Sequence, residues 1–483
     1  MQFSVIFRIL GILLMVFSST HLVPLAVSLF YDDGQHLPFV SSFLATFVAG
    51  LILWVPFYKA NADLRTRDGF LITSCFWILL GLFGALPFLF NDQHPLSLSD
   101  AIFESVSGLT TTGASVFSGI DQLPPSVNYY RHQLHFLGGI GVVLIAVAIL
   151  PMLGIGGMQI YKAEAPGPVK DSKLTPRITQ TASWLFFIYS TIGVACALAF
   201  WLAGMTLFDA ICYSFSIISL GGFAPHDASM GFYQDPLIWV IGAFFMFVSG
   251  LNFALHYPLW HSGNFRQYFS DSESRFFFFY MLLASLFVTL SLILYGVHNQ
   301  LENIHIHAVF QLISIATTTG LLTADLSSWP AYLPMLILLT SCIGGCAGSS
   351  GGGLKVIRVI LIAKQGLREL KQLVHPNAVI PIKLKKKTVP NDILAAVWSF
   401  LAVYMLVFLL IVISLQASGL DFMTAYSATL ASLNNMGVGL GSVASNFAGP
   451  SDMAKWILCA SMILGRLEIF TLLVLFSPAF WQR

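Results

Sequence analysis

Long apolar stretches constrain the fold of this chain most strongly. Ten of them are long enough to cross roughly 30 Å of hydrocarbon as helices. They lie near residues 4–29, 38–58, 70–91, 132–158, 180–203, 236–258, 276–297, 331–361, 392–416 and 453–479. Because 57% of the residues are hydrophobic and only 9% are charged, the apolar surface exceeds what a water-soluble core can bury. We therefore predict an all-α polytopic membrane protein.

The basic residues indicate how the spans are oriented. If the N-terminus is cytoplasmic, only Arg131 and Lys455 lie near the outer ends of spans. The remaining groups then fall inside: Lys59, Arg65 and Arg67, Lys162 to Arg177, Arg266 and Arg275, and Lys355 to Lys387. The positive-inside rule predicts that both termini are cytoplasmic. The first stretch has no small-residue cleavage site, so we expect a retained helix rather than a signal peptide.

Two further features have plain interpretations. The polar interval 364–390 contains KLKKK at 383–387, which is typical of a cytoplasmic topology signal, with a lipid or partner site as the alternative. The six cysteines lie in apolar segments without a CxxC pair, a pattern that favours packing over a disulfide or metal framework.

Four short apolar segments repeat along the chain. They lie near 98–109, 208–219, 305–316 and 421–433, and are too short to span, so they suit re-entrant helices. In each copy a residue pair begins thirteen positions before a glycine: Asp100-Ala101 before Gly113, Asp209-Ala210 before Gly222, His307-Ala308 before Gly320, and Thr424-Ala425 before Gly437. We therefore predict two helices in 1–69, followed by pseudo-symmetric repeats of span, short helix, turn and span in 70–178, 179–272, 273–390 and 391–483.

The turns that end these segments predict a pore. They read TTTGA at 110–114, SLGGF at 219–223, TTTGL at 317–321 and NNMGV at 434–438. Non-helical backbone at membrane depth is tolerated only where it is buried in protein or lines water. A ring of carbonyl oxygens can replace the water shell of a monovalent cation, and the C-terminal ends of the short helices would favour positive charge. A single turn could equally be a helix cap with glycine at C′, but four copies at one offset favour the pore.

Longer motifs carry a family resemblance that covers nearly the whole chain. They are SGLTTTGA at 107–114, SLGGFAPHDAS at 219–229, GGCAGSSGGGLKVIR at 344–358, KQGLRELKQLVHPNAV at 364–379 and LGRLEIFTLLVLF at 464–476. In these motifs the chain resembles the TrkH/TrkG potassium-translocating subunits of the bacterial Trk uptake system, within the Trk/Ktr/HKT superfamily.

The resemblance implies a K⁺ selectivity filter built from the four turns. The residues it assigns to ion binding are Thr111, Thr112 and Gly113, Leu220, Gly221 and Gly222, Thr318, Thr319 and Gly320, and Asn435, Met436 and Gly437. Gly113 favours K⁺, because plant relatives with serine there transport Na⁺. The chain departs from close family members at Leu321 and Val438, which follow the third and fourth glycines.

The run GGCAGSSGGG at 344–353 interrupts a predicted span, and glycine is poor in a helix interior, so we expect a break there. It lacks the Lys-Ser/Thr pair of a phosphate loop. Close helix packing through small residues is one interpretation. The resemblance implies instead an intramembrane gating loop, with Arg466 as a barrier below the filter; an interhelical ion pair is the alternative for Arg466. The gate residues are Gly344, Gly345, Gly348, Gly351, Gly352, Gly353 and Arg466.

The resemblance also implies K⁺ uptake across the bacterial inner membrane by a homodimer, regulated by a cytosolic nucleotide-binding subunit of the TrkA type. Loops near 162–177, 262–275 and 364–390 are the expected docking surface, and apart from transported K⁺ and membrane lipid we expect no cofactor and no nucleic acid. The acidic residues Asp121, Asp227 and Asp325 on the outer side could concentrate cations or simply be solvated.

Two alternative functions stay open. A proton- or sodium-coupled symporter would need an intramembrane carboxylate, for which Glu104 and Glu468 are candidates. A membrane enzyme is the more remote alternative, because it leaves the fourfold glycine repeat unexplained.

Overall fold

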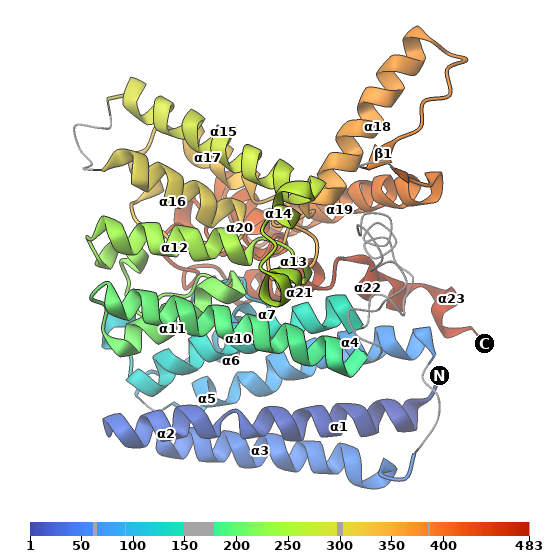
Figure 1. Ribbon diagram of the computed structural model, residues 1–483. Helices are drawn as coiled ribbons and strands as arrows, with labels where there is room; N and C mark the ends of the chain where they lie inside the picture. Colours follow the sequence, from blue (N-terminus) through green and yellow to red (C-terminus); the bar gives the residue numbers. More distant parts are fainter. Residues whose placement is uncertain (61–64, 92, 149–177, 297–302, 385–386, 483) are drawn as a thin grey trace.

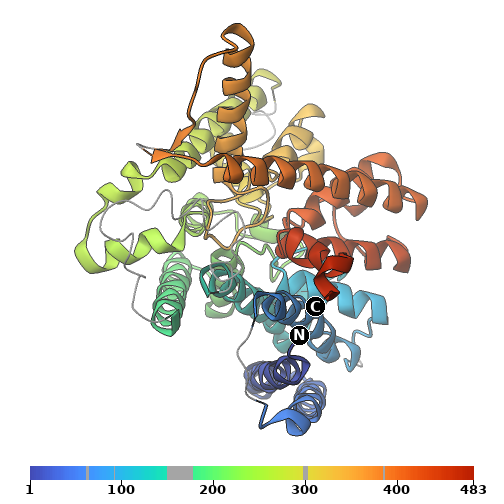
Figure 2. The same cartoon turned by 90° about the vertical axis from the view of Figure 1, so that its right-hand side faces the viewer.

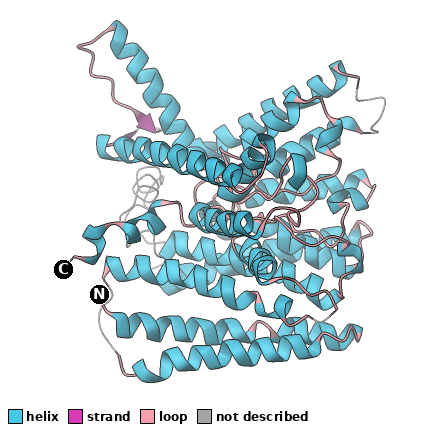
Figure 3. Ribbon diagram, turned by 180° about the vertical axis from the view of Figure 1, so that it is seen from behind, coloured by secondary structure: helices cyan, strands magenta, loops and turns pink. Residues whose placement is uncertain are grey.

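The part of the chain that the structure describes is mostly helical. The computed structural model describes residues 1–60, 65–91, 93–148, 178–296, 303–384 and 387–482. Among these residues, six helical stretches are long and apolar enough to cross a membrane, and the number rises to eight if each of two bent helix pairs is one span. Figure 3 shows the helices together with one short hairpin. The predicted multi-pass helical architecture is confirmed.

The N-terminal helices form a unit of their own. It comprises α1 (Phe3–Ser19), α2 (Leu22–Tyr31), α3 (His36–Trp54) and the 3₁₀ turn η1 (Val55–Phe57). The first two run on as one 29-residue span. In Figure 2 this unit lies at the edge of the molecule, outside the other helices.

The remaining helices follow the predicted order four times. The first group is α4 (Thr66–Gly84), α5 (Leu86–Leu89), α6 (Leu98–Leu109), η2 (Ile120–Gln122) and α7 (Pro125–Ala148). The second is α10 (Ile178–Leu202), α11 (Leu207–Ser219), η4 (Ser229–Phe232), α12 (Pro236–Ser249) and α13 (Phe253–Ser262), with α14 (Arg266–Ser270) after it. The third is α15 (Ser272–Leu294), α16 (Ile304–Ala316), η6 (Leu326–Ser328), α17 (Tyr332–Thr340), α18 (Val356–Val374), β1 (Lys383–Leu384) and β2 (Lys387–Thr388). The fourth is α19 (Asn391–Ala417), α20 (Phe422–Leu433), η7 (Gly441–Val443), α21 (Asp452–Arg466), α22 (Phe470–Leu473), η8 (Val474–Phe476) and α23 (Pro478–Trp481).

The four groups surround a common centre. Viewed from the end that carries both termini, the colours pass round the molecule from cyan through green and orange to red (Figure 2). The short helices α6, α11, α16 and α20 match the four predicted re-entrant segments to within one residue at each end. The residue boundaries that we set for the repeats remain a prediction.

Several predicted spans are broken rather than straight. The stretch 331–361 breaks in its glycine run as predicted, since α17 ends at Thr340 and α18 begins at Val356. The stretches 236–258 and 453–479, predicted as single spans, bend by 98° and 105°. The second bend contains two successive residues with positive φ, Glu468 and Ile469. Of the stretch 132–158, the part after residue 148 lies outside the described residues.

The helix α18 leaves the body of the protein. Figure 1 shows it projecting away from the other helices, at the end where both termini lie. Its first two turns are buried, whereas Leu367, Leu370 and Leu373 farther along are exposed. The chain returns through the antiparallel pair β1 and β2, and Lys364 Nζ donates to the Lys383 carbonyl at 2.6 Å.

Candidate functional site

The repeated residue pair lies near the start of each short helix, and in three of the four helices a capping side chain stands three residues before the pair. The side chains of Ser97, Thr206 and Asp421 accept hydrogen bonds from the backbone N–H groups three residues later, at 3.1–3.2 Å. These caps satisfy donors that a helix start leaves free. The alanine that follows is completely buried in all four copies, at Ala101, Ala210, Ala308 and Ala425. The predicted repeat is therefore a helix start with a small residue for close packing.

Each short helix ends in the same left-handed turn. The residues with positive φ are Thr111 (51°), Leu220 (55°), Thr318 (63°) and Asn435 (52°). The N–H group of the next residue donates to the carbonyl five positions back, in the pairs Thr112 to Ser107, Gly221 to Ser216, Thr319 to Ser314 and Met436 to Ala431, at 2.7–2.9 Å. This is the Schellman arrangement. The C′ position therefore belongs to a residue other than glycine, and the alternative in which the repeated glycine is the cap is wrong.

The glycines two residues later form a closed ring of contacts. Their φ values are 80° at Gly113, 85° at Gly222, 85° at Gly320 and 81° at Gly437. A Cβ atom on Gly113 would lie 2.0 Å from the Gly221 carbonyl oxygen, and one on Gly222 would lie 1.8 Å from that of Thr319. The same holds for Gly320 with Met436 (2.1 Å) and for Gly437 with Thr112 (2.3 Å). Each repeat thus touches the next, the fourth touches the first, and the turns encircle one axis.

Polar side chains brace the turns. The hydroxyls of Thr110 and Thr112 lie 2.8 Å apart, as do those of Thr317 and Thr319. Asn435 Nδ2 donates to the hydroxyl of Thr112 at 3.0 Å, which links the fourth repeat to the first. The turns are therefore held by bonds within and between repeats.

The two departures from the family pattern are both buried. The Leu321 side chain has no exposed surface, and its carbonyl accepts from the Ser314 hydroxyl at 2.7 Å. Val438 is 7% exposed, and its Cγ2 lies 3.4 Å from the Cβ position of Gly320. The turn geometry described above accommodates both residues.

The glycine run between α17 and α18 packs against the turns. The Ser350 hydroxyl donates to the Ile218 carbonyl at 3.0 Å, and the Gly352 N–H donates to the Thr318 hydroxyl at 2.8 Å. A Cβ atom on Gly352 would lie 2.0 Å from the carbonyl oxygen of Asn434. The segment that contains all six predicted gate glycines thus contacts three of the four turn regions.

Charged side chains hold this segment in place. Arg466 Nη1 donates to the Ser350 carbonyl at 2.8 Å, and Lys355 Nζ donates to that of Gly351 at 2.7 Å. Glu273 Oε1 accepts from the N–H groups of Ala347 and Ile357, at 2.6 Å and 3.1 Å. No sequence pattern points to Glu273, because only the folded chain brings α15 next to the glycine run.

The three charged residues that the sequence places within the membrane differ in whether they form ion pairs. Within the described ranges Arg466 bonds to carbonyl groups, including that of Gly138 at 3.4 Å, and no ion pair is observed for it. Both candidate coupling carboxylates do form ion pairs, Glu104 with Arg131 at 2.7 Å and Glu468 with Arg358. The alternative of an interhelical ion pair for Arg466 is therefore not what the structure shows.

An ionic cluster joins Asp121 of the first repeat to Asp209 and His226 of the second. His226 Nδ1 lies 2.6 Å from Asp121 Oδ1, and its Nε2 lies 3.3 Å from Asp209 Oδ2. Burial lowers the pKa of His226, but the hydrogen bonds to Asp209 and Asp121 outweigh it and raise that pKa above the ordinary value. Burial acts against ionisation of Asp121, but bonds from His226 and from the Asp227 backbone lower its pKa overall.

The other predicted outer carboxylates also have structural partners. Asp227 Oδ1 accepts from the Gly119 N–H at 3.1 Å, and Asp325 caps η6 by accepting from the Ser327 N–H at 2.8 Å. These contacts give both residues a role in ordering the loops.

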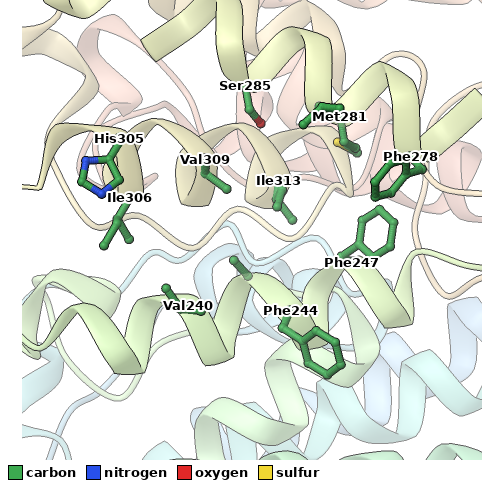
Figure 4. A pocket seen from close by; sticks show the side chains of 12 residues that line it. Val240, Phe244, Phe247, Phe278, Met281, Ser285, His305, Ile306, Val309 and Ile313 are labelled. Atoms are coloured by element: carbon green, nitrogen blue, oxygen red, sulfur yellow. The ribbon is translucent and has the colours of Figure 1, made fainter.

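An apolar cavity of about 440 Å³ lies elsewhere, between α12, α15 and α16. Figure 4 shows Phe244 and Val240 on one side of it, opposite Met281 and Ile313. Ser285 and His305 supply the polar side chains of its lining. Such a lining offers little to replace the water shell of an ion, so the turns, rather than this cavity, are the candidate ion site.

Comparison with known proteins identifies the family. The TrkH family profile, described as cation transport protein, matches residues 35–483. The chain is 49% identical to the Trk system potassium uptake protein TrkH of Halomonas elongata and 48% identical to that of Escherichia coli K12, each across the full length of both chains. It superposes on the crystal structure of the potassium transporter TrkH from Vibrio parahaemolyticus with a TM-score of 0.93, at 47% identity and full coverage of both chains. The chain therefore belongs to the TrkH family of cation transport proteins.

Proposed function

We propose that this protein takes up potassium ions across the bacterial inner membrane through the ring formed by the four turns. The proposal rests on a closed set of contacts. The carbonyl oxygen of the next repeat lies against each filter glycine, so close that a Cβ atom on the glycine would collide with it. The relatives are named as potassium uptake proteins, which supports K⁺ as the ion and sets the membrane-enzyme alternative aside.

The ring suits a cation that has lost its water. The carbonyls of Thr112, Gly221, Thr319 and Met436 come from four different repeats, and each approaches the filter glycine of the preceding repeat in the ring, so that Thr112 of the first approaches Gly437 of the fourth. The four short helices end at the turns, so their partial negative C-terminal charges lie next to the ion path. We assign ion binding to the twelve filter residues named from the sequence, of which Thr111, Leu220, Thr318 and Asn435 supply the left-handed bends.

The ion pairs favour uptake driven by membrane potential alone. A potential of 100 mV contributes about 2.3 kcal/mol for each charge admitted. A coupled symporter needs a carboxylate that can bind a proton or Na⁺ during the cycle. Glu104 has no exposed surface and is paired with Arg131, while Glu468 is paired with Arg358. Both carboxylates are therefore occupied as structural partners.

The glycine run is the proposed gate. It lies against the turns, and Arg466 adds a buried positive charge that repels a passing cation. Opening requires the run to leave the turns, which breaks the bonds from Arg466 to Ser350 and from Gly352 to Thr318. We assign these contacts to the closed state of the proposed gate.

The cytoplasmic side is the proposed site of regulation. Both termini and the projecting helix α18 lie at one end (Figure 1), as the positive-inside rule predicts for the cytoplasm. We assign α18, with its exposed leucines and its basic residues Lys364, Arg368 and Lys371, to contacts with a second copy and with a nucleotide-binding subunit of the TrkA type. The stretch 262–275 contains α14 and the first residues of α15, whereas 162–177 lies outside the described residues.

Flux measurements in proteoliposomes test the proposal. K⁺ and Na⁺ uptake are compared under an inside-negative potential, with no pH or Na⁺ gradient. We expect selective K⁺ uptake driven by potential alone. Uptake that begins only when a proton or Na⁺ gradient is added would establish the symporter instead, and no flux in any condition, with or without the regulatory subunit, would refute the pore.

A further inference from the structure

A fully buried ion pair lies between the first two turns. Arg131 Nε, on α7, is 2.7 Å from Glu104 Oε1, on α6, and neither side chain has exposed surface. Two charges without water are costly unless further hydrogen bonds satisfy them. The partners that supply these bonds show what the pair does.

Those partners belong to the segments that leave the filter. Glu104 Oε2 accepts from the Val116 N–H at 2.9 Å, and the Ser115 hydroxyl lies 3.1 Å from Oε1. Arg131 Nη2 donates to the Ser115 hydroxyl at 3.0 Å, and Nη1 lies 3.4 Å from the Ala224 carbonyl oxygen. Ser115 and Ala224 each stand two residues after a filter glycine. The pair therefore holds the same position in two neighbouring repeats.

A stack of side chains connects Arg131 to the ring of filter turns. The Arg131 guanidinium lies 4.3 Å from the centroid of the Phe223 ring, and the His135 ring stacks on Phe223 at 4.1 Å. His135 in turn fills the space beside Gly221, where a Cβ atom would lie 2.5 Å from Nδ1. The Gly221 carbonyl oxygen is the one that lies against Gly113 in the ring. A shift of Arg131 would therefore be transmitted to the contact between the first two repeats.

Two of the other three repeats make the same tie with an uncharged side chain. Glu104 stands nine residues before its filter glycine, where the later repeats have Tyr213, Gln311 and Ala428. The Tyr213 hydroxyl donates to the Ser229 carbonyl at 2.7 Å, and Gln311 Nε2 donates to that of Ala324 at 2.6 Å. In three repeats this position thus ties the short helix to the segment after the filter, and in the first it does so with a charge.

We propose that Glu104 and Arg131 are positioning residues for ion selection: their pair sets the spacing of the first two filter turns and so contributes to the preference for K⁺ over Na⁺. The inference rests on the proposed function. Whether selectivity follows from cavity size or from the field of the carbonyls, it depends on where those oxygens are held. Glu104 then serves the filter rather than an ion-coupling step.

A double substitution tests this proposal without leaving one buried charge unpaired. Glu104→Met combined with Arg131→Met removes both charges and their bonds to Ser115 and Ala224, and an apolar replacement of a buried pair is often neutral for stability. The control is Asp100→Asn combined with Lys455→Met, which removes an ion pair of 2.5 Å between α6 and α21. The readout is the ratio of K⁺ to Na⁺ flux in proteoliposomes, with melting temperature as the test of folding.

We expect the K⁺/Na⁺ flux ratio to fall at least tenfold in the Glu104/Arg131 variant and to stay within twofold of the parent in the control. A folded variant with an unchanged ratio would overturn the inference, as would an equal fall in the control. If the double variant does not fold, Arg131→Lys keeps the charge but cannot reach both segments, so an unchanged ratio there would equally overturn it. An unsubstituted protein that shows no K⁺ preference would refute the proposed function instead.

Discussion

The ring of glycines makes a quantitative prediction at Gly113. In Gly113→Ala, the new Cβ would lie 2.0 Å from the Gly221 carbonyl oxygen, whereas such contacts are essentially never closer than 3.0 Å. The oxygen or the turn must therefore move by about 1 Å, at the point where the ion is bound. The φ of 80° adds strain of about 1–2 kcal/mol for an L-residue.

A matched control separates these two effects. Gly119, in the outer loop, has a similar φ of 73°, but a Cβ atom there would meet nothing within 4 Å. Gly119→Ala therefore imposes the backbone strain without the collision. The difference between the two variants isolates the displacement of the filter oxygen.

The assay is the ratio of K⁺ to Na⁺ flux in proteoliposomes at fixed potential. We expect Gly113→Ala to lower the ratio at least tenfold, a loss of about 1.4 kcal/mol of discrimination. Gly119→Ala should leave it within twofold of the parent. If Gly113→Ala keeps the parental ratio, or if both variants lose it equally, the glycine ring does not set selectivity.

Three further predictions concern the gate, coupling and the outer loops. Arg466→Met removes a charged hydrogen bond to the Ser350 carbonyl, about 1.5–3 kcal/mol, so K⁺ flux without the regulatory subunit should rise roughly tenfold; a fall would contradict the barrier role. Glu468→Gln should lower stability by stranding the Arg358 charge, yet leave uptake driven by potential alone; loss of a proton- or Na⁺-gradient dependence present in the parent would instead make Glu468 a coupling site. Because the folded-state pKa of His226 is raised, its ion pairs stabilise the protein fully below about pH 6.5 and lose that effect as pH rises through the folded pKa. The loss, about 0.5–1 kcal/mol for this partly exposed pair, should appear as a drop in melting temperature above pH 6.5 that is absent in His226→Gln.

The sequence predicted the local elements well. The four short helices were located to within one residue, because their length, flanking spans and repeated glycine offset are all local signals. The break in 331–361 was likewise predicted, since a run of glycines is a local feature. The alternation of apolar and polar segments thus contains most of the topology.

Local sequence signals do not predict which residues of different repeats are in contact. Nothing in the spacing shows that Gly113 lies against Gly221, or that Glu104 pairs with Arg131 across two helices. The bend at Glu468 and Ile469 was missed because two apolar-flanked residues with positive φ leave no mark on hydropathy. The glycine was predicted as the special backbone position, but the left-handed cap at Thr111 was not, because threonine rarely adopts it.

The central claim is that cations bind on the axis of the four turns, and anomalous scattering from crystals grown in Rb⁺ or Tl⁺, used as K⁺ substitutes, tests it most directly. We expect a peak within the ring bounded by the carbonyl oxygens of Thr112, Gly221, Thr319 and Met436, and its loss when Na⁺ replaces the heavier ion. Ordered density for the four turns with no peak between them, or a peak confined to another part of the protein, would contradict the account.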